Sequence, residues 1–499
     1  MTQRGRFLLA VAVLLVAVVY FPLTKNYFVY DDFLDLDEIS NESVWTYLLR
    51  VHGGHVYLVR NLIFYLCHRL FGAEAAYYFW VVLITHLLNV VLVFAIIQRL
   101  TDSAVLACFG AGLWGTSPVN EGCLGWYSVY GQAVVATIVL SICLQLVRSS
   151  TERGAPAPST LATWYVMLLV GSTCFGTGIG VTLVFPVVIL LLLPASPRRA
   201  RIVSAFGSLP LVVLVLYAAL QYLAARRAAA SSETALVWYL LAGLKYWERI
   251  FSMLVHLFAF GLSSLLLGFA FKWEMYRALM PVVVPGFVAV SALVAVAGRK
   301  EGMAHRLAAF VVVAIGCYGM IAAGRGFFYP NATATMAGAS QSRYHYLGPI
   351  ALTIVVCLLL AWFGQRRKLR AWYGSTLLAA WIALTAFLYV RFGAAIDHHD
   401  ESREETQQVI AAIRAAIDAE PGRQVRIPNR PFRHIGALYD RREFPGQAAI
   451  FVIFFPSNTV DGKRVYFVER DADVVASAEK GTRISSLLVR SDDSGSTTR

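Results

Sequence analysis

The sequence has few charged residues. Only 15% are Asp, Glu, Lys or Arg, whereas 58% are hydrophobic and the mean hydropathy is +0.61. A soluble domain has about 25% charged and 45–50% apolar residues, so this composition excludes a soluble globular protein. Apolar stretches that approach the roughly 20 residues needed to cross a bilayer recur along the chain. We therefore predict a polytopic protein embedded in a lipid bilayer.

Other common signals are missing as well. The seven cysteines lie mostly inside apolar stretches and form no Cys-x-x-Cys pair, which indicates small buried side chains and not a disulfide framework or a zinc site. We find no internal repeat of roughly 20 to 50 residues. No small-residue cleavage site follows the N-terminal stretch RFLLAVAVLLVAVVYF. We interpret that stretch as an uncleaved first helix.

The net charge of +13 does not indicate nucleic-acid binding, because the basic residues cluster in short loops between apolar stretches. Such clusters orient helices by staying in the cytoplasm. Arg4 and Arg6 therefore place the N-terminus in the cytoplasm, and about eleven spans place the C-terminus outside. The predicted spans cover about 7–23, 77–97, 103–116, 131–147, a helical hairpin around CFGTGIG, 202–222, 279–297, 306–323, 347–364 and 371–391.

Residues 235–271 do not fit this alternation. GRKEGMAHR and GQRRKLR are both basic and therefore both predicted to be cytoplasmic, so the segment between 223 and 278 must begin and end outside. We predict an interfacial helix followed by a re-entrant or membrane-grazing segment. The alternative is a true span at 250–271 with one of the charge signals misread.

The chain changes character after residue 395. DESREETQQVIAAIRAAIDAEPG predicts an amphipathic helix that ends at Pro421-Gly422, and RQVRIP, AAIFVIFF, RVYFVE and SSLLVR predict short strands. The predicted fold is therefore an all-α polytopic membrane domain (1–395) with a small C-terminal extracytoplasmic α/β domain (396–499). The last residues, SDDSGSTTR, are predicted to be a disordered tail.

Acidic residues follow the first span directly, in FVYDDFLDLDEIS. Asp31 and Asp32 adjoin the membrane, where an unpaired carboxylate is costly, and a carboxylate placed there can take a proton from a hydroxyl nucleophile. The alternative is that they cap a short helix. Asp35, Asp37 and Glu38 are expected to be a solvated loop face.

Further polar and aromatic residues are predicted on the same side of the membrane. Arginines there can hold a phosphate leaving group through charge-assisted hydrogen bonds. Aromatic rings stack on sugars but also sit at membrane interfaces. Five of these residues have a structural alternative: helix capping for Glu121, interfacial placement for Arg343, an interfacial aromatic belt for Tyr344 and Tyr346, and a neutral imidazole bonded to a neighbouring helix for His86. The candidates are Arg60, His86, Asn89, Glu121, Trp126, Arg343, Tyr344 and Tyr346.

These motifs, in this order, resemble the GT-C superfamily of polytopic glycosyltransferases, which includes the protein O-mannosyltransferases and their relatives with tetratricopeptide repeats. The resemblance begins with YDD after the first span and the Arg-Asn pair of YLVRNLIFYLCHRLFG ahead of the second span. It continues with THLLN within the second span, SPVNEGCLGW after the short third span, and SRYHYLGP before a late span. It covers residues 1–200 and, locally, 320–360. The C-terminal domain shows no tetratricopeptide pattern.

The resemblance implies inverting transfer of a sugar from a polyprenyl-phosphate donor to a hydroxyl acceptor on a protein, lipid or glycan, on the non-cytoplasmic face. In that interpretation Asp31 or Asp32 is the general base. Arg60, Arg343, Tyr344 and Tyr346 contact the donor's phosphate and lipid, and Glu121, Trp126, His86 and Asn89 position the acceptor or donor. We expect a multi-pass protein of a bacterial inner membrane.

Two departures from the family pattern bear on the phosphate site. Asn61 follows Arg60 where the family has proline, and FGTGIG stands where the repeat-bearing relatives have a Lys-Glu pair, so a charged contact is missing. No metal is firmly predicted, because HGGH (52–55) lacks the spacing of a helical metal site; a divalent metal held with loop acids is the alternative. The alternative functions are a transporter or flippase of lipid-linked glycans, or a non-catalytic scaffold.

Overall fold

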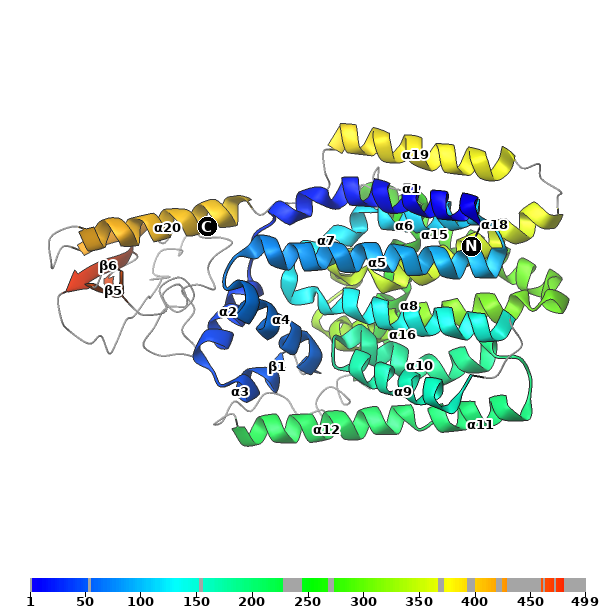
Figure 1. Cartoon of the computed structure of the whole chain (residues 1–499), viewed down its shortest axis with the longest axis horizontal. Coiled ribbons are helices and arrows are strands. Elements are labelled where there is room, and N and C mark those ends of the chain that lie inside the picture. Colours follow the sequence, from blue (N-terminus) through cyan, green and yellow to red (C-terminus); the bar gives the residue numbers. More distant parts are fainter. Residues whose placement is uncertain are drawn as a thin grey trace.

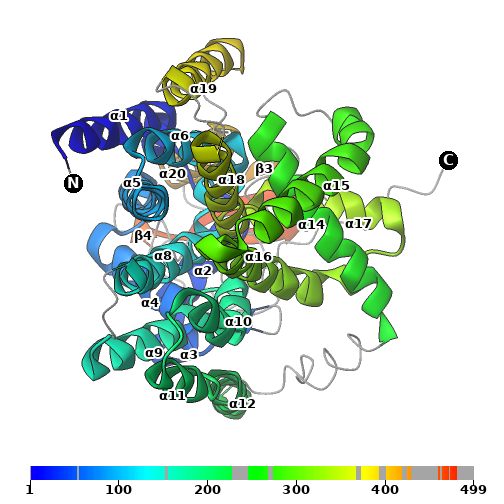
Figure 2. The same cartoon turned by 90° about the vertical axis from the view of Figure 1, so that its right-hand side faces the viewer.

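Helices dominate the computed structural model of the chain. The structure describes residues 2–52, 55–151, 156–227, 245–267, 273–366, 372–392 and 400–418, and strands at 424–428, 459–460, 463–470 and 473–479. Most of the long helices run along one common direction (Figure 1) and several are seen nearly end-on after a quarter turn (Figure 2). The long helices are α1 (Gln3–Tyr20), α5 (Ala75–Thr101), α6 (Ala104–Gly115), α8 (Gly131–Thr151), α9 (Pro158–Ser172), α10 (Gly176–Leu192), α11 (Pro197–Phe206), α12 (Leu209–Arg227), α14 (Trp247–Leu267), α15 (Trp273–Ala297), α16 (Met303–Arg325), α18 (Leu347–Arg366) and α19 (Trp372–Phe392).

Short elements collect at one end of this bundle, which we call the site end (Figure 1). They are η1 (Phe21–Lys25), α2 (Asp31–Asn41), α3 (Val44–Leu48), the two-residue strands β1 (Val51–His52) and β2 (His55–Val56), α4 (Leu58–Phe71), η2 (Pro118–Asn120), α7 (Glu121–Leu124), η3 (Tyr127–Val129), η6 (Gly326–Phe328), α17 (Ala332–Ala339) and η7 (Ser342–Tyr344). The turn η5 (Arg299–Glu301) joins α15 to α16.

Among the described residues, eight helical segments are long and apolar enough to cross a membrane: Gln3–Lys25, Ala75–Thr101, Tyr127–Ser150, Pro197–Leu220, Trp247–Leu265, Met280–Ala297, Met303–Phe328 and Leu347–Arg366. Shorter apolar helices cover Ala104–Gly115, Gly176–Leu192 and Tyr373–Ala386. A multi-pass membrane protein is thus confirmed at the level of helix length and composition. The expected total of about eleven spans remains a prediction.

Helix α1 shows how the sequence directs the packing. Leu8, Ala12, Val16 and Tyr20 recur every four residues and are all buried, because positions four apart lie on one face of a helix. Apolar residues on the other face of α1, such as Leu14, are exposed. The helix thus presents one apolar face to the bundle and another to the surroundings, as a membrane helix at the edge of a bundle does.

Glycines allow α10 and α16 to approach closely. A Cβ atom added at Gly180 would lie 1.9 Å from the carbonyl oxygen of Gly316, and one added at Gly178 would lie 2.0 Å from that of Gly171 in α9. Small residues are used in this way where membrane helices contact each other through their backbones. The glycines of GTGIG therefore hold the N-terminal half of α10 against two neighbouring helices.

Replacement of Gly180 by alanine is expected to force α10 and α16 apart and to destabilise the protein by about 1–3 kcal/mol, as overpacking does. Thermal unfolding in detergent measures this effect. Gly319→Ala in the neighbouring helix α16 is the control, since nothing lies within 4 Å of a Cβ added there. Equal stability of the two variants would contradict this account of the contact.

Only residues 245–267 of the segment that broke the predicted alternation, together with the beginning of α15, are described. Helix α14 is long and apolar enough to span a membrane, as the alternative interpretation requires. One of its contacts is to the site end, where Ile250 lies against Gly326 of η6, and Gly261 lies against Tyr318 of α16 and against His345. An interfacial or re-entrant course and a true span therefore both stay predictions.

Helix α4, which lies between the first and second predicted spans, is amphipathic. Arg60, Asn61 and Phe64 are buried on one face, whereas Leu62 and Leu66 on the other are exposed. An exposed leucine stripe on a helix at the end of a membrane bundle is typical of a segment that lies in the interface plane. Arg60 therefore points inward, toward the acidic helix α2.

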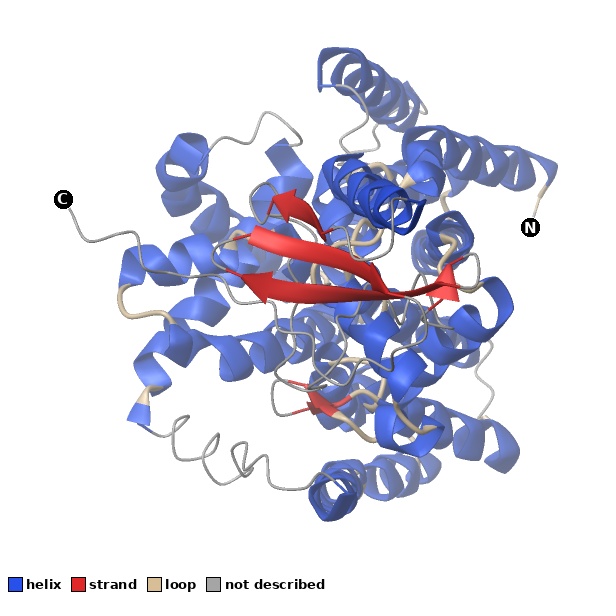
Figure 3. Cartoon of the chain, turned by 90° about the vertical axis from the view of Figure 1, so that its left-hand side faces the viewer, coloured by secondary structure: helices blue, strands red, loops and turns tan. Residues whose placement is uncertain are grey.

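The C-terminal elements also lie at the site end (Figures 1 and 3). Helix α20 (Asp400–Asp418) corresponds to the predicted amphipathic helix. The strands β3 (Gln424–Pro428), β4 (Thr459–Val460), β5 (Lys463–Arg470) and β6 (Asp473–Glu479) pair antiparallel in the order β3-β6-β5-β4. β3 and β5 coincide with the predicted strands RQVRIP and RVYFVE, whereas AAIFVIFF, SSLLVR, the tail and the predicted domain boundary lie outside the described residues.

Helix α20 is attached to the segment that leads into α2. The hydroxyl group of Ser402 donates to the carbonyl oxygen of Phe28 at 2.7 Å. Arg403 donates to the carbonyl oxygen of Lys25, and its guanidinium lies 5.6 Å from the centroid of the Tyr27 ring. The C-terminal part of the chain thus contacts the main chain a few residues before the acidic helix.

Candidate functional site

The acidic stretch is a helix and not an open loop. Helix α2 begins at Asp31, directly after Tyr30, whose φ of 50° is uncommon for a residue with a side chain. Asp31 and Asp32 occupy the first turn, where negative charge is favoured by the helix dipole. The capping alternative is thus correct in part: both acids begin a short helix, although Tyr30 occupies the N-cap position.

Asp32 is fully buried and does not line a cavity. Its Oδ2 accepts a hydrogen bond from the main-chain N–H of Val29 at 3.1 Å, and its Oδ1 accepts from the main-chain N–H and the hydroxyl group of Ser128, both at 2.7 Å. Burial raises the pKa of Asp32 to about 7, although the hydrogen bonds from Ser128 and Val29 lower it. Asp32 therefore joins α2 to η3 and does not face a substrate cavity.

Asp35, one turn further along α2, forms a buried ion pair with Arg60. Arg60 Nη1 lies 2.6 Å from Asp35 Oδ1, which also accepts from the hydroxyl group of Tyr47 at 3.2 Å. Asp35 Oδ2 lies 3.0 Å from Ser128 Oγ. The negative charge of Asp35 strongly favours the charged guanidinium and raises the pKa of Arg60 despite its burial. This pair fixes α4 against α2.

The expectation that Asp35, Asp37 and Glu38 form a solvated face is wrong. They are 1%, 4% and 3% exposed. Glu38 forms an ion pair with Arg50 at 3.0 Å. Because the short helices α3 and α4 fold over α2, they bring arginines to these carboxylates and exclude water from them.

A cavity of about 300 Å³ opens beside this acidic helix. Asp31 and Asp35 line it from α2, and Arg60 and Tyr57 line it from the region of α4. The rest of the lining comes from the beginning of α10, from α16 and from η6, and most of it is apolar or glycine: Phe175, Gly176, Thr177, Met320, Ile321, Gly324, Arg325 and Phe328. The cavity therefore combines carboxylates and arginines with an apolar wall formed by two apolar helices.

Two arginines of the cavity have no carboxylate partner among the residues that the structure describes. Arg343 lies 5.4 Å from the Trp126 ring centroid and 5.2 Å from that of Tyr344, and its buried Nε makes no hydrogen bond. Arg325 lies 6.0 Å from the ring centroid of Phe328. Both arginines line the cavity, and guanidinium groups can hold a phosphate group through charge-assisted hydrogen bonds.

The N-terminus of α10 also borders the cavity. Gly176 and Thr177 belong to the first turn of the helix, where main-chain N–H groups have no acceptor within the helix and favour anions. The buried Thr177 hydroxyl has no hydrogen-bond partner among the described residues. This turn lies within FGTGIG, where the resemblance predicted a missing charged contact. A helix N-terminus occupies that place instead.

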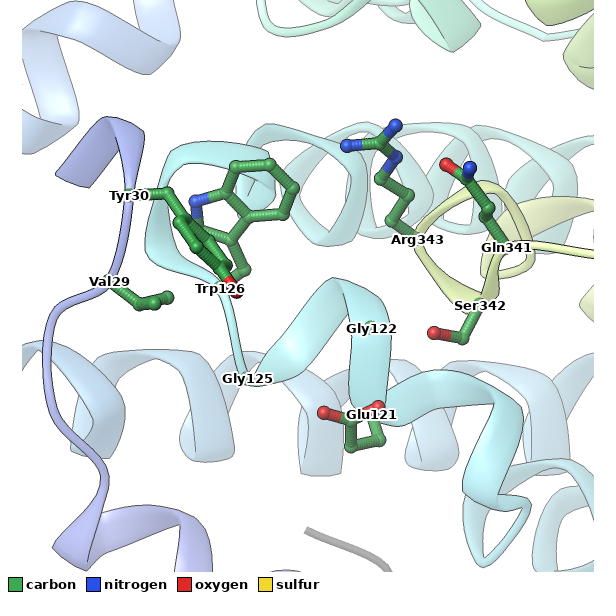
Figure 4. A pocket seen from close by; sticks show the side chains of 9 residues that line it. All are labelled: Val29, Tyr30, Glu121, Gly122, Gly125, Trp126, Gln341, Ser342 and Arg343. Carbon is green, nitrogen blue, oxygen red and sulfur yellow. The ribbon is translucent and has the colours of Figure 1, made fainter. Parts of the chain in front are cut away.

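A second cavity of about 400 Å³ adjoins the first, and Trp126 and Arg343 line both. Figure 4 shows Tyr30 and Trp126 together on one side of it, with Gln341, Ser342 and Arg343 on the other. The rings of Tyr30 and Trp126 meet edge to face at 5.8 Å. Glu121 also lines this cavity. One wall is thus aromatic and the other carries hydrogen-bonding groups.

The turn before α18 is positioned by α7. A Cβ added at Gly122 would lie 2.1 Å from Ser342 Oγ and 2.4 Å from the main-chain nitrogen of Arg343. Gln132 at the beginning of α8 donates a hydrogen bond to the carbonyl oxygen of Arg343. Arg343 is therefore held between two elements, with its side chain left to face the cavities.

His86, Asn89 and Tyr346, which we predicted near the substrates, line neither cavity. Asn89 Nδ2 donates a hydrogen bond to the Tyr346 hydroxyl group at 3.2 Å. The same hydroxyl group lies 2.9 Å from His86 Nδ1. The other ring nitrogen, His86 Nε2, lies 3.0 Å from the carbonyl oxygen of Gly115. That oxygen can only accept, so Nε2 carries the proton and Nδ1 accepts. The three side chains form a satisfied buried network that joins α5 to α6 and to the segment before α18. Their predicted substrate contacts are not supported by the geometry.

Asn89→Ala is expected to lower the free energy of unfolding by about 1–3 kcal/mol, because the Tyr346 hydroxyl and Ala133 carbonyl groups lose a buried partner. The affinity for a lipid-phosphate ligand should not change. Thermal unfolding and a binding titration measure the two effects, with Thr137→Val, which loses one hydrogen bond to Asn89, as the milder comparison. A loss of affinity at unchanged stability would contradict the structural role.

Among the described residues, no group of three or more His, Cys, Asp or Glu side chains is placed to hold a metal ion. His52 and His55 face each other in register across the two-residue strands β1 and β2.

Comparison of the sequence with protein-family models gives no match, and comparison with curated proteins gives none either.

Sequence reasoning identified Asp31, Arg60, Glu121, Trp126, Arg343 and Tyr344, and the structure places these around the two cavities. It missed Ser128, Thr177 and Arg325. Asp35 carried a usable signal, because it follows Asp31 by four residues and therefore lies on the same face of a helix. Ser128 carried none, because its contacts depend on how distant segments pack.

Proposed function

We propose that this protein is an integral-membrane glycosyltransferase of the GT-C type that transfers a sugar from a polyprenyl-phosphate donor to a hydroxyl acceptor. The observation that carries the proposal is the first cavity, in which Arg325 and Arg343, without carboxylate partners, face Asp31 beside an apolar wall. A lipid-linked phosphate needs these three features together: cationic groups, an apolar surface for the chain, and a base next to the anomeric carbon.

The donor is proposed to occupy the first cavity. Its phosphate group would lie between Arg343, Arg325 and the N-terminus of α10, and the first isoprene units would lie against Phe175, Met320 and Phe328. Arginine binds phosphate through paired charge-assisted hydrogen bonds. The helix N-terminus supplies main-chain donors in place of the charged pair that the related enzymes have.

The acceptor is proposed to enter through the second cavity. Its aromatic wall of Tyr30 and Trp126 suits a sugar ring, and its polar wall of Gln341 and Ser342 offers donors and acceptors for hydroxyl groups. Trp126 and Arg343 line both cavities. An acceptor hydroxyl at that boundary would meet the anomeric carbon on the face opposite the leaving phosphate.

Asp31 is proposed to be the general base. Asp32 has its carboxylate oxygens bound to Val29 and Ser128 and lies outside the cavity, whereas Asp31 is exposed and lines it. The Asp31 carboxylate takes the acceptor's proton, the acceptor oxygen forms a bond to the anomeric carbon, and the bond from that carbon to the phosphate oxygen breaks. The phosphate keeps the electron pair, and one displacement inverts the anomeric configuration.

The proposed orientation places the site end outside the cytoplasm. Basic residues mark the opposite end of the bundle: Arg99 in the last turn of α5, Arg148 in the last turn of α8, and the arginines at the beginning of α11. Short loops rich in Lys and Arg stay in the cytoplasm. In a bacterial inner membrane the site and the C-terminal α/β domain would then face the extracytoplasmic side.

Transfer from a labelled donor tests the proposal. Purified protein in nanodiscs is incubated with polyprenyl phosphates that carry different radiolabelled hexoses or pentoses, together with sugar, glycolipid and peptide acceptors. We expect release of polyprenyl phosphate and a labelled product with inverted anomeric configuration. Donor binding without turnover for any sugar or acceptor, with donor translocation in proteoliposomes, would overturn the enzyme in favour of a transporter.

A further inference from the structure

The hydroxyl group of Ser128 lies between two buried carboxylates. Ser128 Oγ is 2.7 Å from Asp32 Oδ1 and 3.0 Å from Asp35 Oδ2. Both distances are those of hydrogen bonds between oxygen atoms. A serine hydroxyl group has one hydrogen atom, so it can donate to only one of the two carboxylates.

Among the described residues, no other group supplies a hydrogen atom for the second of these two contacts of Ser128 Oγ. The main-chain N–H groups of Val29 and Ser128 are directed at Asp32 Oδ2 and Oδ1. Both donors to Asp35 from other residues, Arg60 Nη1 and the Tyr47 hydroxyl group, are directed at its Oδ1 and not at Oδ2. If both carboxylates were ionised, one of the two oxygen pairs at Ser128 would have two acceptors and no hydrogen, inside a region from which water is excluded.

We propose that Asp32 carries a proton and donates it to Ser128 Oγ, which in turn donates its own hydrogen to Asp35 Oδ2. Every oxygen–oxygen contact in the chain Asp32–Ser128–Asp35 then contains one hydrogen atom. Asp32 and Ser128 are positioning residues in this arrangement. They hold Asp35 against Arg60 at the wall of the first cavity, beside the proposed base Asp31.

The charges around Asp32 agree with this assignment. Arg60 from α4 is directed at Asp35 and not at Asp32, and Tyr47 from α3 also bonds Asp35. Asp32 has no cationic partner among the described residues, and it is fully buried. Burial, with a smaller contribution from the charge of Asp35, raises the pKa of Asp32 to about 7. A carboxyl group in these surroundings keeps its proton below that pH.

The arrangement couples the proton on Asp32 to anion binding, and this consequence rests on the proposed function. Below pH 7 Asp32 is neutral, and the charges of Asp35 and Arg60 offset each other. As the pH rises through about 7, Asp32 ionises, adds a negative charge next to the cavity-lining Ser128, and competes with Asp35 for the Ser128 hydrogen. The cavity should then bind a phosphate diester more weakly, by about 5- to 30-fold for one unit charge in partly buried surroundings.

Infrared spectroscopy tests the proton itself, without any need for activity. The full-length protein in nanodiscs is titrated from pH 5.5 to 8.5, and the carbonyl stretch of protonated carboxyl groups is followed in the wild type and in Asp32→Asn. We expect a band that disappears with a midpoint near 7 in the wild type and is missing in the variant. A band that is absent in the wild type, or unchanged in Asp32→Asn, would overturn the proposal.

Binding of farnesyl phosphoglucose tests the coupling. This diester keeps a single charge over the whole range, so any change of affinity comes from the protein. We expect its dissociation constant to rise with pH in the wild type and to stay flat in Asp32→Asn, whose side chain cannot ionise. Ser128→Thr should behave as the wild type, and Ser128→Ala should bind more weakly at low pH.

The outcomes separate the two proposals. If the expected infrared band is observed but no sugar is transferred, the protonation of Asp32 is supported and the proposed glycosyltransferase activity is contradicted. If sugar is transferred but donor binding to the wild type does not change with pH, the glycosyltransferase activity is supported and the coupling of the Asp32 proton to anion binding is overturned. A serine that is merely structural would change the thermal stability of Ser128→Ala and leave the pH profile of binding unaltered.

Discussion

Asp31→Asn is expected to lower the turnover of sugar transfer by about 10²- to 10⁴-fold, the usual contribution of a positioned general base. Asparagine keeps the size and polarity of the side chain but cannot accept the hydroxyl proton. Donor affinity should stay within about threefold, because the phosphate is proposed to bind Arg325 and Arg343 and not Asp31. Single-turnover transfer and a separate binding titration measure the two quantities.

Two further aspartates provide the controls. Asp102, in a left-handed conformation at the end of α5 (φ of 54°), is exposed on the opposite end of the bundle, and asparagine tolerates this conformation well. Asp102→Asn should therefore transfer sugar as the wild type does. Asp32→Asn should lose far less turnover than Asp31→Asn, since Asp32 does not line the first cavity and acts there only as a positioning residue. Loss of turnover in Asp32→Asn alone, with Asp31→Asn active, would show that the base is misassigned.

Arg343→Gln is expected to lower kcat/KM by about 10²- to 10³-fold, the typical effect of removing one group that stabilises a developing negative charge. The leaving phosphate gains charge as its bond to the sugar breaks, so the loss should appear in kcat as well as in donor affinity. Arg343→Lys should recover only part of the activity, because a lysine cannot bond two phosphate oxygens with a planar fork or stack on Trp126.

Arg366→Gln is the matched control for charge. Arg366 pairs with Glu301 at 2.8 Å, and both side chains are about half exposed. An exposed pair of this kind contributes about 0–1 kcal/mol to stability, and it is far along α18 from the site end. If Arg343→Gln and Arg366→Gln have the same kcat/KM, Arg343 does not bind the phosphate, and the proposal that the first cavity holds the donor loses support.

The acidic stretch shows how far sequence reasoning reaches. Periodicity and composition predicted the apolar helices well, because each of them depends on its own run of residues. The same reasoning placed Asp37 and Glu38 in solvent. These acids are buried because Arg50 and the helices α3 and α4 fold over α2. The sequence of the stretch itself does not indicate which residues elsewhere in the chain will pair with its carboxylates.

The polar residues inside the apolar helices illustrate the complementary difficulty. An ionisable group within a membrane segment is a functional candidate by default, and His86 was predicted on that ground. The structure satisfies both its ring nitrogens with the Tyr346 hydroxyl group and the Gly115 carbonyl oxygen. A polar group that serves packing and one that serves a substrate have the same sequence signature, since only the spatial arrangement shows which atoms are left without partners.

The sequence by itself determined that this is a multi-pass membrane protein and that acids, arginines and aromatic residues flank its apolar helices, because burial of apolar helices and the placement of basic loops are local properties. Only the tertiary structure decided that Asp31 faces a cavity while Asp32 is buried. The physical reason is that the partners of these neighbouring carboxylates come from distant segments: Ser128, which binds Asp32, is 96 residues away along the chain.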